Sequence, residues 1–358
     1  MDERPLIAAG DRISALPDEI LHNILYRLDD PGQVARTSSL SRRWLHLWRT
    51  YPVLEVDYQS YTKFAGFSAA SARRITLYYE NCKAPLDSLR LSLEILHPSI
   101  LRFTSKDDVR TLLAAALGGG YGSPLDIAIR FGIDCSYSFP AGSFSNCGRT
   151  KTLKLRGCDL SGVGTVSLLS LRVLDLEYVD LTQQFLHNVV VDNAPNLESL
   201  TLTRCPGLKR LEVAVRNFPK LQTLHIDSGS RWELQLTAAP FLQSLVIHVD
   251  KSFKLKAASS ASAPNLRCLV ISSLFKQFAR PDHEEFISKL PSLEILKLSG
   301  VCLSDEYLRS LMDKAPLLRT VRCKHLPLKE MVEISGHESV EDDDNDDEEV
   351  SYIFRMVL

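Results

Sequence analysis

The first candidate for chemistry is the glycine-rich stretch Gly118-Gly119-Gly120-Tyr121-Gly122. Such loops cradle phosphate groups when a Gly-Lys-Ser/Thr element follows and a helix opens directly behind it. Neither feature follows here, so the stretch is interpreted as a flexible loop. The sequence Gly-Ser-Phe-Ser-Asn at 142–146 likewise departs from the G-x-S-x-G pattern of a nucleophilic serine. The sequence predicts neither site.

Residue types that bind metals are present, but they are not spaced as ligands. The nine histidines include no H-E-x-x-H pair, and the eight cysteines include no C-x-x-C pair. Wide, irregular cysteine spacing also fits no small disulfide framework. We therefore predict reduced thiols, no metal, no cofactor and no enzymatic activity. Reduced thiols favour an intracellular location, in the nucleus, the cytoplasm or both.

The charge distribution separates one segment from the rest. The net charge of the chain is −2, yet residues 338–349 hold nine acidic residues and no Lys or Arg, which leaves +7 elsewhere. The positive excess is spread thinly, so a nucleic-acid partner is not expected. Like charges at this density repel one another, and the region 329–358 is predicted to be a disordered acidic tail. Its last eight residues, 351–358, are apolar enough to dock on another surface.

Membrane insertion is not expected. The chain starts Met-Asp-Glu-Arg-Pro, with charges of both signs and no apolar stretch behind them, which argues against a signal peptide. No uncharged apolar stretch approaches the length of a membrane-spanning helix.

Helical periodicity dominates residues 11–51. Ile20, Ile24 and Leu28 recur at i, i+4 and i+8 behind Pro17, which suits the first turn of a helix. A second short helix is expected to run through residue 37. A third is expected to carry an apolar stripe that begins at Leu40 and continues through Trp44, Leu47 and Trp48. Three short helices make only a small core, so the module is either a cap on the next domain or a plug that needs a partner.

The residues within these helices resemble a known motif. Leu16-Pro-Asp-Glu-Ile-Leu21, then Leu25 and Leu28, then Leu40-Ser-Arg-Arg-Trp44 and Leu47-Trp48 resemble the F-box, most closely that of plant F-box/leucine-rich-repeat proteins. Asp29 departs from the proline that often follows the last leucine, and Pro31 is expected to serve the same turn. The resemblance implies that the helices bind a Skp-family adaptor and, through it, a cullin. The adaptor-binding candidates are Leu16, Pro17, Ile20, Leu21, Ile24, Leu25 and Leu28.

An internal repeat fills residues 52–328. A pattern close to L-x-x-L-x-L recurs, and its central apolar residues lie between 21 residues (Leu153 to Leu174) and 27 residues (Leu269 to Leu296) apart. This spacing is typical of leucine-rich repeats. The central residues are Leu153, Leu174, Leu200, Leu224, Leu245, Leu269, Leu296 and Val321. Similar strand patterns at 54–56, 89–91 and 127–129 precede them.

The predicted fold is therefore α/β, with an N-terminal three-helix F-box followed by an irregular leucine-rich-repeat solenoid. Each repeat cannot bury its leucines alone, so the repeats stack into a curved parallel sheet. Helical or irregular segments return the chain between strands, for example at 183–191, 284–290 and 305–314. Residues 107–117 also read as a helix.

Side chains that alternate with the buried leucines should face the concave surface. The candidates for binding a protein substrate are Lys154, Arg156, Asp175, Glu177, His225, His248, Lys297 and Arg322. The face is basic near its C-terminal end, which would suit an acidic partner segment. For any single one of these residues, a merely solvated surface explains the sequence equally well.

The function implied by the resemblance is that of a substrate receptor in an SCF-type (Skp–cullin–F-box) ubiquitin ligase. Two alternatives remain open. The chain is either a leucine-rich-repeat scaffold whose F-box acts outside ubiquitination, or a receptor in which a small molecule completes the binding face. The sequence names no substrate, because one scaffold supports many concave surfaces.

Overall fold

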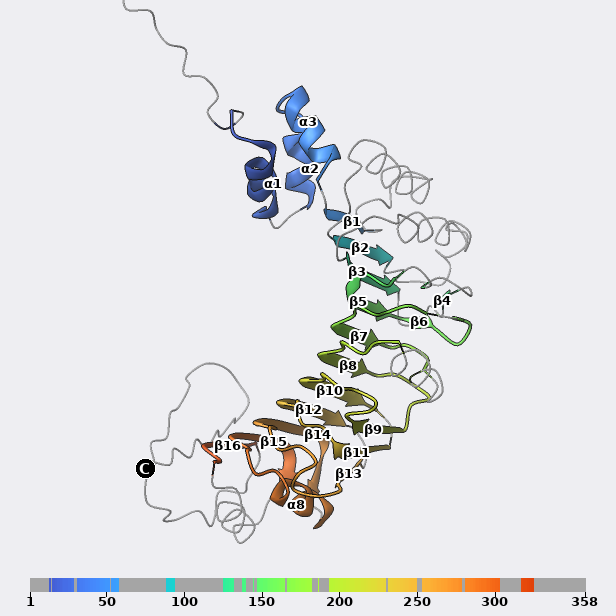
Figure 1. The fold of residues 1–358 in the computed structure, drawn as a ribbon, viewed down its shortest axis with the longest axis vertical. Helices are drawn as coiled ribbons and strands as arrows, with labels where there is room; N and C mark the ends of the chain where they lie inside the picture. Colours follow the sequence, from blue (N-terminus) through green and yellow to red (C-terminus); the bar gives the residue numbers. More distant parts are fainter. Residues whose placement is uncertain are drawn as a thin grey trace, which may run out of the picture.

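The computed structural model describes a chain of three helices followed by a long stack of strands (Figure 1). The described residues are 13, 15–28, 31–51, 53–57, 88–93, 125–131, 137–139, 144, 147–164, 166–181, 186, 193–229, 231–249, 253–278, 281–302 and 317–324. The predicted helix at 107–117, the glycine-rich loop and the acidic tail lie outside them.

The N-terminal helices are α1 (Asp18–Tyr26), α2 (Pro31–Thr37) and α3 (Arg42–Arg49). Pro17 precedes α1, and two carboxylates lie in its first turn, where they complement the helix dipole. Ser41 is the N-cap of α3, because its side chain accepts a hydrogen bond from the Trp44 backbone N–H at 3.3 Å. This cap starts the helix two residues later than the apolar stripe predicted. Leu40 therefore lies outside α3 and is 66% exposed, and the prediction that it joins the stripe is wrong.

The main sheet contains eleven parallel strands among the described residues, ordered along the stack as they are along the chain. Their bounds are β1 (Val53–Asp57), β2 (Ser88–Leu93), β3 (Leu125–Phe131), β5 (Thr150–Arg156), β7 (Val173–Glu177), β8 (Ser199–Thr203), β10 (Thr223–Ser228), β12 (Ser244–Val249), β14 (Cys268–Phe278), β15 (Ile295–Cys302) and β16 (Thr320–Lys324). The strands predicted at 54–56, 89–91 and 127–129 are the first three of them. The strands line the inner side of a curved solenoid, and helices α1, α2 and α3 stand at its N-terminal end (Figure 1).

The register of the sheet follows the sequence repeat. Leu153 lies opposite Leu174, Leu174 opposite Leu200, and the series continues without a slip to Leu296 and Val321. All of these side chains are buried in one core that extends along the solenoid. A shift of one residue would turn the leucines toward solvent, so the buried face specifies the register. The predicted solenoid fold is confirmed.

The returns between strands, predicted to be helical or irregular segments, include strands of their own. Three consecutive returns contain strands β9 (Arg210–Ala214), β11 (Trp232–Ala238) and β13 (Phe253–Ala257), which form a second parallel sheet. Their residues alternate between buried and exposed, which is a strand pattern that the sequence already contained. A small ladder joins β4 (Tyr137–Ser138) to β6 (Cys158–Asp159).

One return is helical as predicted. Helix α8 (Pro281–Ser288) overlaps the helical segment expected at 284–290. The Lys289 side chain ties this return to the second sheet, because its Nζ donates to the Ala257 carbonyl at 3.0 Å. Most of 183–191 and all of 305–314 lie outside the described residues.

Candidate functional site

The helical module at the N-terminal end has a closed core of its own. Its buried side chains are Leu21, Leu25, Val34, Trp44, Leu47 and Tyr51, and Leu16, Leu28 and Trp48 pack against them. Two of the predicted adaptor-binding residues, Leu21 and Leu25, are therefore fully buried. In the folded module they are core residues that hold α1 against α3, so their side chains are not exposed to an adaptor.

An apolar stripe stays on the outside of α1. Ile20 is 45% exposed and Ile24 is 38% exposed. They stand four residues apart and so share one face of the helix. Pro17 is exposed at the start of the same helix. The structure therefore presents Pro17, Ile20 and Ile24 to solvent, and it leaves Leu16 and Leu28 half-buried.

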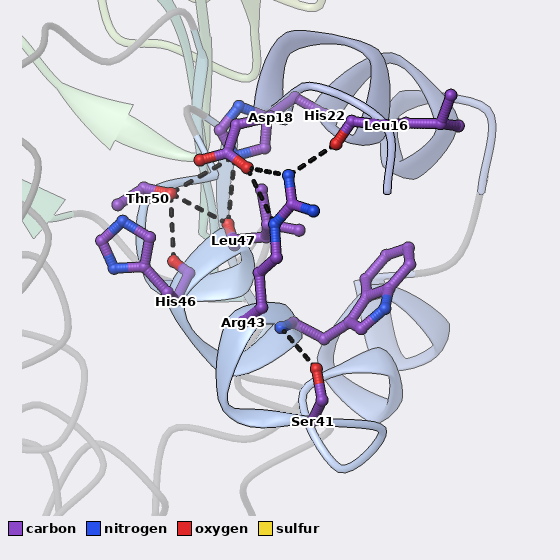
Figure 2. Close-up of polar contacts among 9 residues, drawn as sticks. Leu16, Asp18, His22, Ser41, Arg43, His46, Leu47 and Thr50 are labelled. Atoms are coloured by element: carbon purple, nitrogen blue, oxygen red, sulfur yellow. Dashed lines mark hydrogen bonds and ion pairs between the residues drawn. The ribbon is translucent and has the colours of Figure 1, made fainter. Parts of the chain in front are cut away.

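Polar contacts hold α1 and α3 in this arrangement (Figure 2). The Arg43 guanidinium bonds the Asp18 carboxylate at 2.7 Å and donates to the Leu16 carbonyl at 2.5 Å. On the other side, His22 Nε2 lies 3.2 Å from the Leu47 carbonyl. The same ring nitrogen lies 3.3 Å from the Thr50 hydroxyl oxygen. Thr50 caps the end of α3 by donating to the His46 carbonyl at 3.0 Å.

Replacing Arg43 by Met is expected to destabilise the helical module by about 1 kcal/mol. The Asp18 ion pair is partly exposed and contributes little, about 0.2–1 kcal/mol, and the bond to the Leu16 carbonyl adds a similar amount. Denaturant unfolding of Arg43→Met, Asp18→Asn and the double variant measures the coupling. Strictly additive effects of the two substitutions would contradict a direct interaction.

The second candidate surface is the concave face of the main sheet. Its central column runs Lys154, Asp175, Thr201, His225, Val246, Val270, Lys297, Arg322, each opposite the next. A second column, two residues further along each strand, runs Arg156, Glu177, Thr203, Asp227, His248, Ser272, Ser299, Lys324. All eight predicted substrate-binding residues belong to these columns. The side chains of Arg322 and Lys324 lie outside the described part of the structure.

Contacts within the face join some of these residues. Arg156 Nε lies 3.4 Å from the Glu177 carboxylate, which makes a partly buried ion pair. The rings of His225 and His248 meet edge to face, with their centroids 5.2 Å apart. Lys154 and Lys297 are exposed and make no ion pair with any residue that the structure describes. The face therefore has an aromatic pair at its centre and exposed lysines at its two ends.

Two residues of this surface were not predicted from the sequence. Tyr178 and Arg204 directly follow β7 and β8 and have positive φ angles of 50° and 52°, a left-handed conformation that is uncommon outside glycine. Arg204 Nε forms an ion pair with the Asp227 carboxylate at 2.8 Å, and the Arg156 guanidinium lies 6.0 Å from the centre of the Tyr178 ring. Gly157 holds the equivalent position after β5 with φ 66°. Among these three positions, Gly157 is the one whose residue type indicates a left-handed turn in the sequence.

Burial lowers the pKa of His225, and the neighbouring His248 lowers it further, while Asp227 and Asp175 act in the opposite direction. The folded state therefore binds this proton less readily than the unfolded chain. The resulting stability is present above the unfolded pKa of about 6.5 and is lost as the pH falls below it.

Acidification from pH 7 to pH 5 is accordingly expected to destabilise the wild-type solenoid more than a His225→Gln variant. Denaturant unfolding of the two proteins across this range measures the difference, since all other titrating groups are shared. Parallel stability curves for the two proteins would contradict the assignment.

No group of residues suited to metal binding occurs in the part of the chain that the structure describes. Burial raises the pKa of Cys147 to about 11 and that of Cys205 to about 12, so both thiols are protonated at neutral pH. No described helix has the length and apolar composition needed to cross a membrane.

Two known domain families match this chain, and the matched residues include the exposed face of α1 and most of the concave face. A family model described as the At1g61320/AtMIF1 LRR domain matches residues 123–319, more than half of the chain, and the F-box domain model matches residues 13–55. Among solved structures, the Leptospira interrogans LRR protein LIC12759 matches 70% of this chain and 74% of its own, at 13% identity. Its TM-score of 0.21 is too low to bear on function.

Several proteins of Arabidopsis thaliana are similar over longer stretches. F-box/LRR-repeat protein At3g26922 is 30% identical over 73% of this chain and 74% of its own length. F-box/LRR-repeat protein 25 is 28% identical over 59% of this chain and 75% of its own length. F-box/FBD/LRR-repeat protein At3g52680 is 31% identical over 68% of this chain, which spans only 52% of that relative.

Proposed function

The chain belongs to the plant-type F-box/LRR-repeat family, and from this premise we propose that it is a substrate-recognition subunit of an SCF-type cullin–RING ubiquitin ligase. Proteins of this family are typically adaptors without enzymatic activity. The F-box would bind a Skp-family adaptor and, through it, a cullin. The solenoid would bind the protein to be ubiquitinated.

The observation that carries the proposal is the exposed apolar stripe of Ile20 and Ile24 on a module whose core is already closed. The exposed parts of these isoleucines do not contribute to the core of the module. They would suit a partner that covers one face of α1 with apolar side chains. Because each is already more than half buried in the free module, covering the rest would contribute about 0.6–1.3 kcal/mol gross. The net affinity is smaller, because association entropy opposes binding.

The role of the chain in such a complex is to position two other proteins. It would perform no bond chemistry itself. Holding a substrate next to the ubiquitin-transferring enzyme raises the local concentration of its lysines, and this proximity is the catalytic gain.

Affinity purification of the full chain from plant cells under proteasome inhibition tests the proposal. Recovery of a Skp-family adaptor together with a cullin and ubiquitinated proteins is the expected result. Recovery of the adaptor without cullin would favour the alternative of a scaffold outside ubiquitination. Substrate capture that requires an added small molecule would favour the ligand-sensing receptor.

The site of action is proposed to be the nucleus, the cytoplasm or both, on the evidence of the cysteine pattern alone. Microscopy of a fluorescent fusion tests it. A fusion found in the secretory pathway would overturn it.

A further inference from the structure

The second sheet has one buried face and one open face. Apolar side chains are buried at alternate positions of β9, β11 and β13, and the polar side chains between them stay exposed or half-buried. We call the polar side the outer face. Its side chains are Arg210, Glu212, Arg231, Glu233, Gln235, Thr237, Lys254 and Lys256. The three strands follow β8, β10 and β12 along the chain and form a sheet separate from the one that carries the concave columns (Figure 1).

The register of this sheet places charged side chains in rows. Glu233 lies opposite Arg210 on β9 and opposite Lys254 on β13. The next row, in the same strand order, is Glu212, Gln235 and Lys256. Neighbouring strands lie about 4.8 Å apart and alternate residues of one strand about 7 Å apart, so the two rows and Arg231 occupy a patch on the order of 10–15 Å across.

Both carboxylates of the outer face already have cationic partners. Lys256 Nζ donates to Glu233 Oε1 at 2.7 Å. Arg216, in the turn that follows β9, donates to Glu212 Oε1 at 3.1 Å, and the Thr237 hydroxyl donates to the same oxygen at 3.1 Å. The negative charge of the face is therefore matched by Lys256 and Arg216.

Positive charge remains in excess around Glu233. The hydrogen bond from Lys256 lowers the pKa of Glu233, and the nearby charges of Lys256, Arg210 and Lys254 lower it further. One carboxylate is thus surrounded by several cations. The cations of this face that form no ion pair with a described residue are Arg210, Arg231 and Lys254.

The size of the patch indicates the chemistry of its partner. Unpaired cations within about 15 Å can contact a few anionic groups at a time, and alternate residues of an extended peptide lie about 7 Å apart. A peptide with acidic residues at alternate positions therefore matches the spacing of the outer face. Double-stranded DNA carries one charge per about 1.7 Å along its axis, so most of its charges would extend beyond this patch. The geometry thus favours a protein segment over a nucleic acid.

We propose that the outer face of the second sheet docks an acidic segment of a partner protein, with Asp or Glu side chains at alternate positions. The carboxylates of this segment contact Arg210, Arg231 and Lys254. The outer face is separate from both α1 and the concave columns, so the chain can hold a further protein there. The proposal goes beyond the ligase assignment and does not depend on it.

Carbodiimide coupling to the purified full chain tests the docking, because this reagent joins a carboxylate to an amine that it contacts. The probe is an isotope-labelled Ser-Glu-Ser-Glu-Ser-Glu-Ser peptide, acetylated and amidated so that its glutamates are the reactive groups. Mass spectrometry is expected to place the main coupling site at Lys254. Arg210→Gln combined with Arg231→Gln is expected to lower the yield at Lys254 about fivefold, because two exposed charge contacts are lost.

Two controls separate docking from general effects of charge. Arg42→Gln combined with Arg319→Gln removes the same charge from exposed positions elsewhere and is expected to leave the yield at Lys254 unchanged. The exposed Lys297 on the concave face is the internal reference in every sample, and its coupling is expected to stay constant. Loss of the fold would change the coupling of both lysines, so a selective loss at Lys254 reports the outer face.

Salt provides a test that needs no substitution. In the wild-type chain, about 0.3 M NaCl screens exposed charge contacts and is expected to lower the yield at Lys254 more than that at Lys297. Equal coupling of both lysines, equal salt sensitivity of both, or an equal loss in the Arg42 and Arg319 variant would each overturn the proposal. So would stronger competition by single-stranded oligothymidylate than by unlabelled peptide, which would indicate a nucleic-acid partner. The assay needs no adaptor or cullin, so its failure is distinguishable from failure of the ligase assignment.

Discussion

Replacing Ile20 and Ile24 together by Asp is expected to abolish adaptor binding while the chain stays folded. Both side chains are exposed in the free protein, at 45% and 38%, so the substitutions remove little packing. In the complex, losing the contacts of the still-exposed part of the two isoleucines costs about 1–2.5 kcal/mol, which corresponds to an affinity roughly 10- to 70-fold weaker. The penalty for burying two carboxylates adds to it.

Titration calorimetry with a purified Skp-family adaptor measures the change, and thermal unfolding verifies the fold. The matched control is Phe241→Asp with Leu317→Asp, because these residues are similarly exposed, at 54% and 48%, but lie in turns of the solenoid. The control is expected to bind normally. An unchanged affinity of the α1 variant, or an equal loss in the control, would contradict the role of the stripe.

Leu21→Ala separates binding from folding. Leu21 is buried in the core of the helical module, so its truncation costs about 2–5 kcal/mol of stability. This variant is expected to lose adaptor binding together with its helical structure. The Asp variants at Ile20 and Ile24 are expected to lose binding alone.

The second large effect is expected at the centre of the solenoid core. Leu224 is 0% exposed and lies between Leu200 and Leu245 in the register. Leu224→Ala leaves a cavity bounded by both neighbouring repeats, so the free energy of unfolding is expected to fall by about 2–5 kcal/mol. Because repeat stability depends on the contacts between neighbours, the loss extends to the repeats on each side.

Urea unfolding followed by far-ultraviolet circular dichroism measures this loss. Thr223→Ala is the matched control, since Thr223 is the preceding residue of the same strand and faces the concave side. Its effect is expected to stay below about 1 kcal/mol, the range of strand propensity. Equal destabilisation by the two substitutions would contradict the division of β10 into a buried face and an open face.

Much of the solenoid was predictable because its pattern is local and repeated. The two-residue alternation assigns Leu153 and its equivalents to the core and His225 and its equivalents to the face, and one register serves every repeat. The same alternation was present in the returns, for example at Leu234 and Leu236, but the returns were predicted only as helical or irregular segments. The start of α3 was misplaced because the Ser41 cap, and not the apolar stripe, decides where the helix begins.

The amino-acid sequence by itself determined the order of helices and strands, the repeat register and the columns of the concave face, because these follow from the spacing of apolar residues along the chain. The tertiary structure decided which isoleucines and leucines of α1 are exposed. The sequence gives apolar side chains on more than one side of this helix, and only the packing of α3 determines which of them are buried. The tertiary structure also paired Arg204 with Asp227. This ion pair joins two neighbouring repeats, and Arg204 reaches Asp227 from a left-handed turn. The spacing of residues along the chain does not predict the distance between these two side chains.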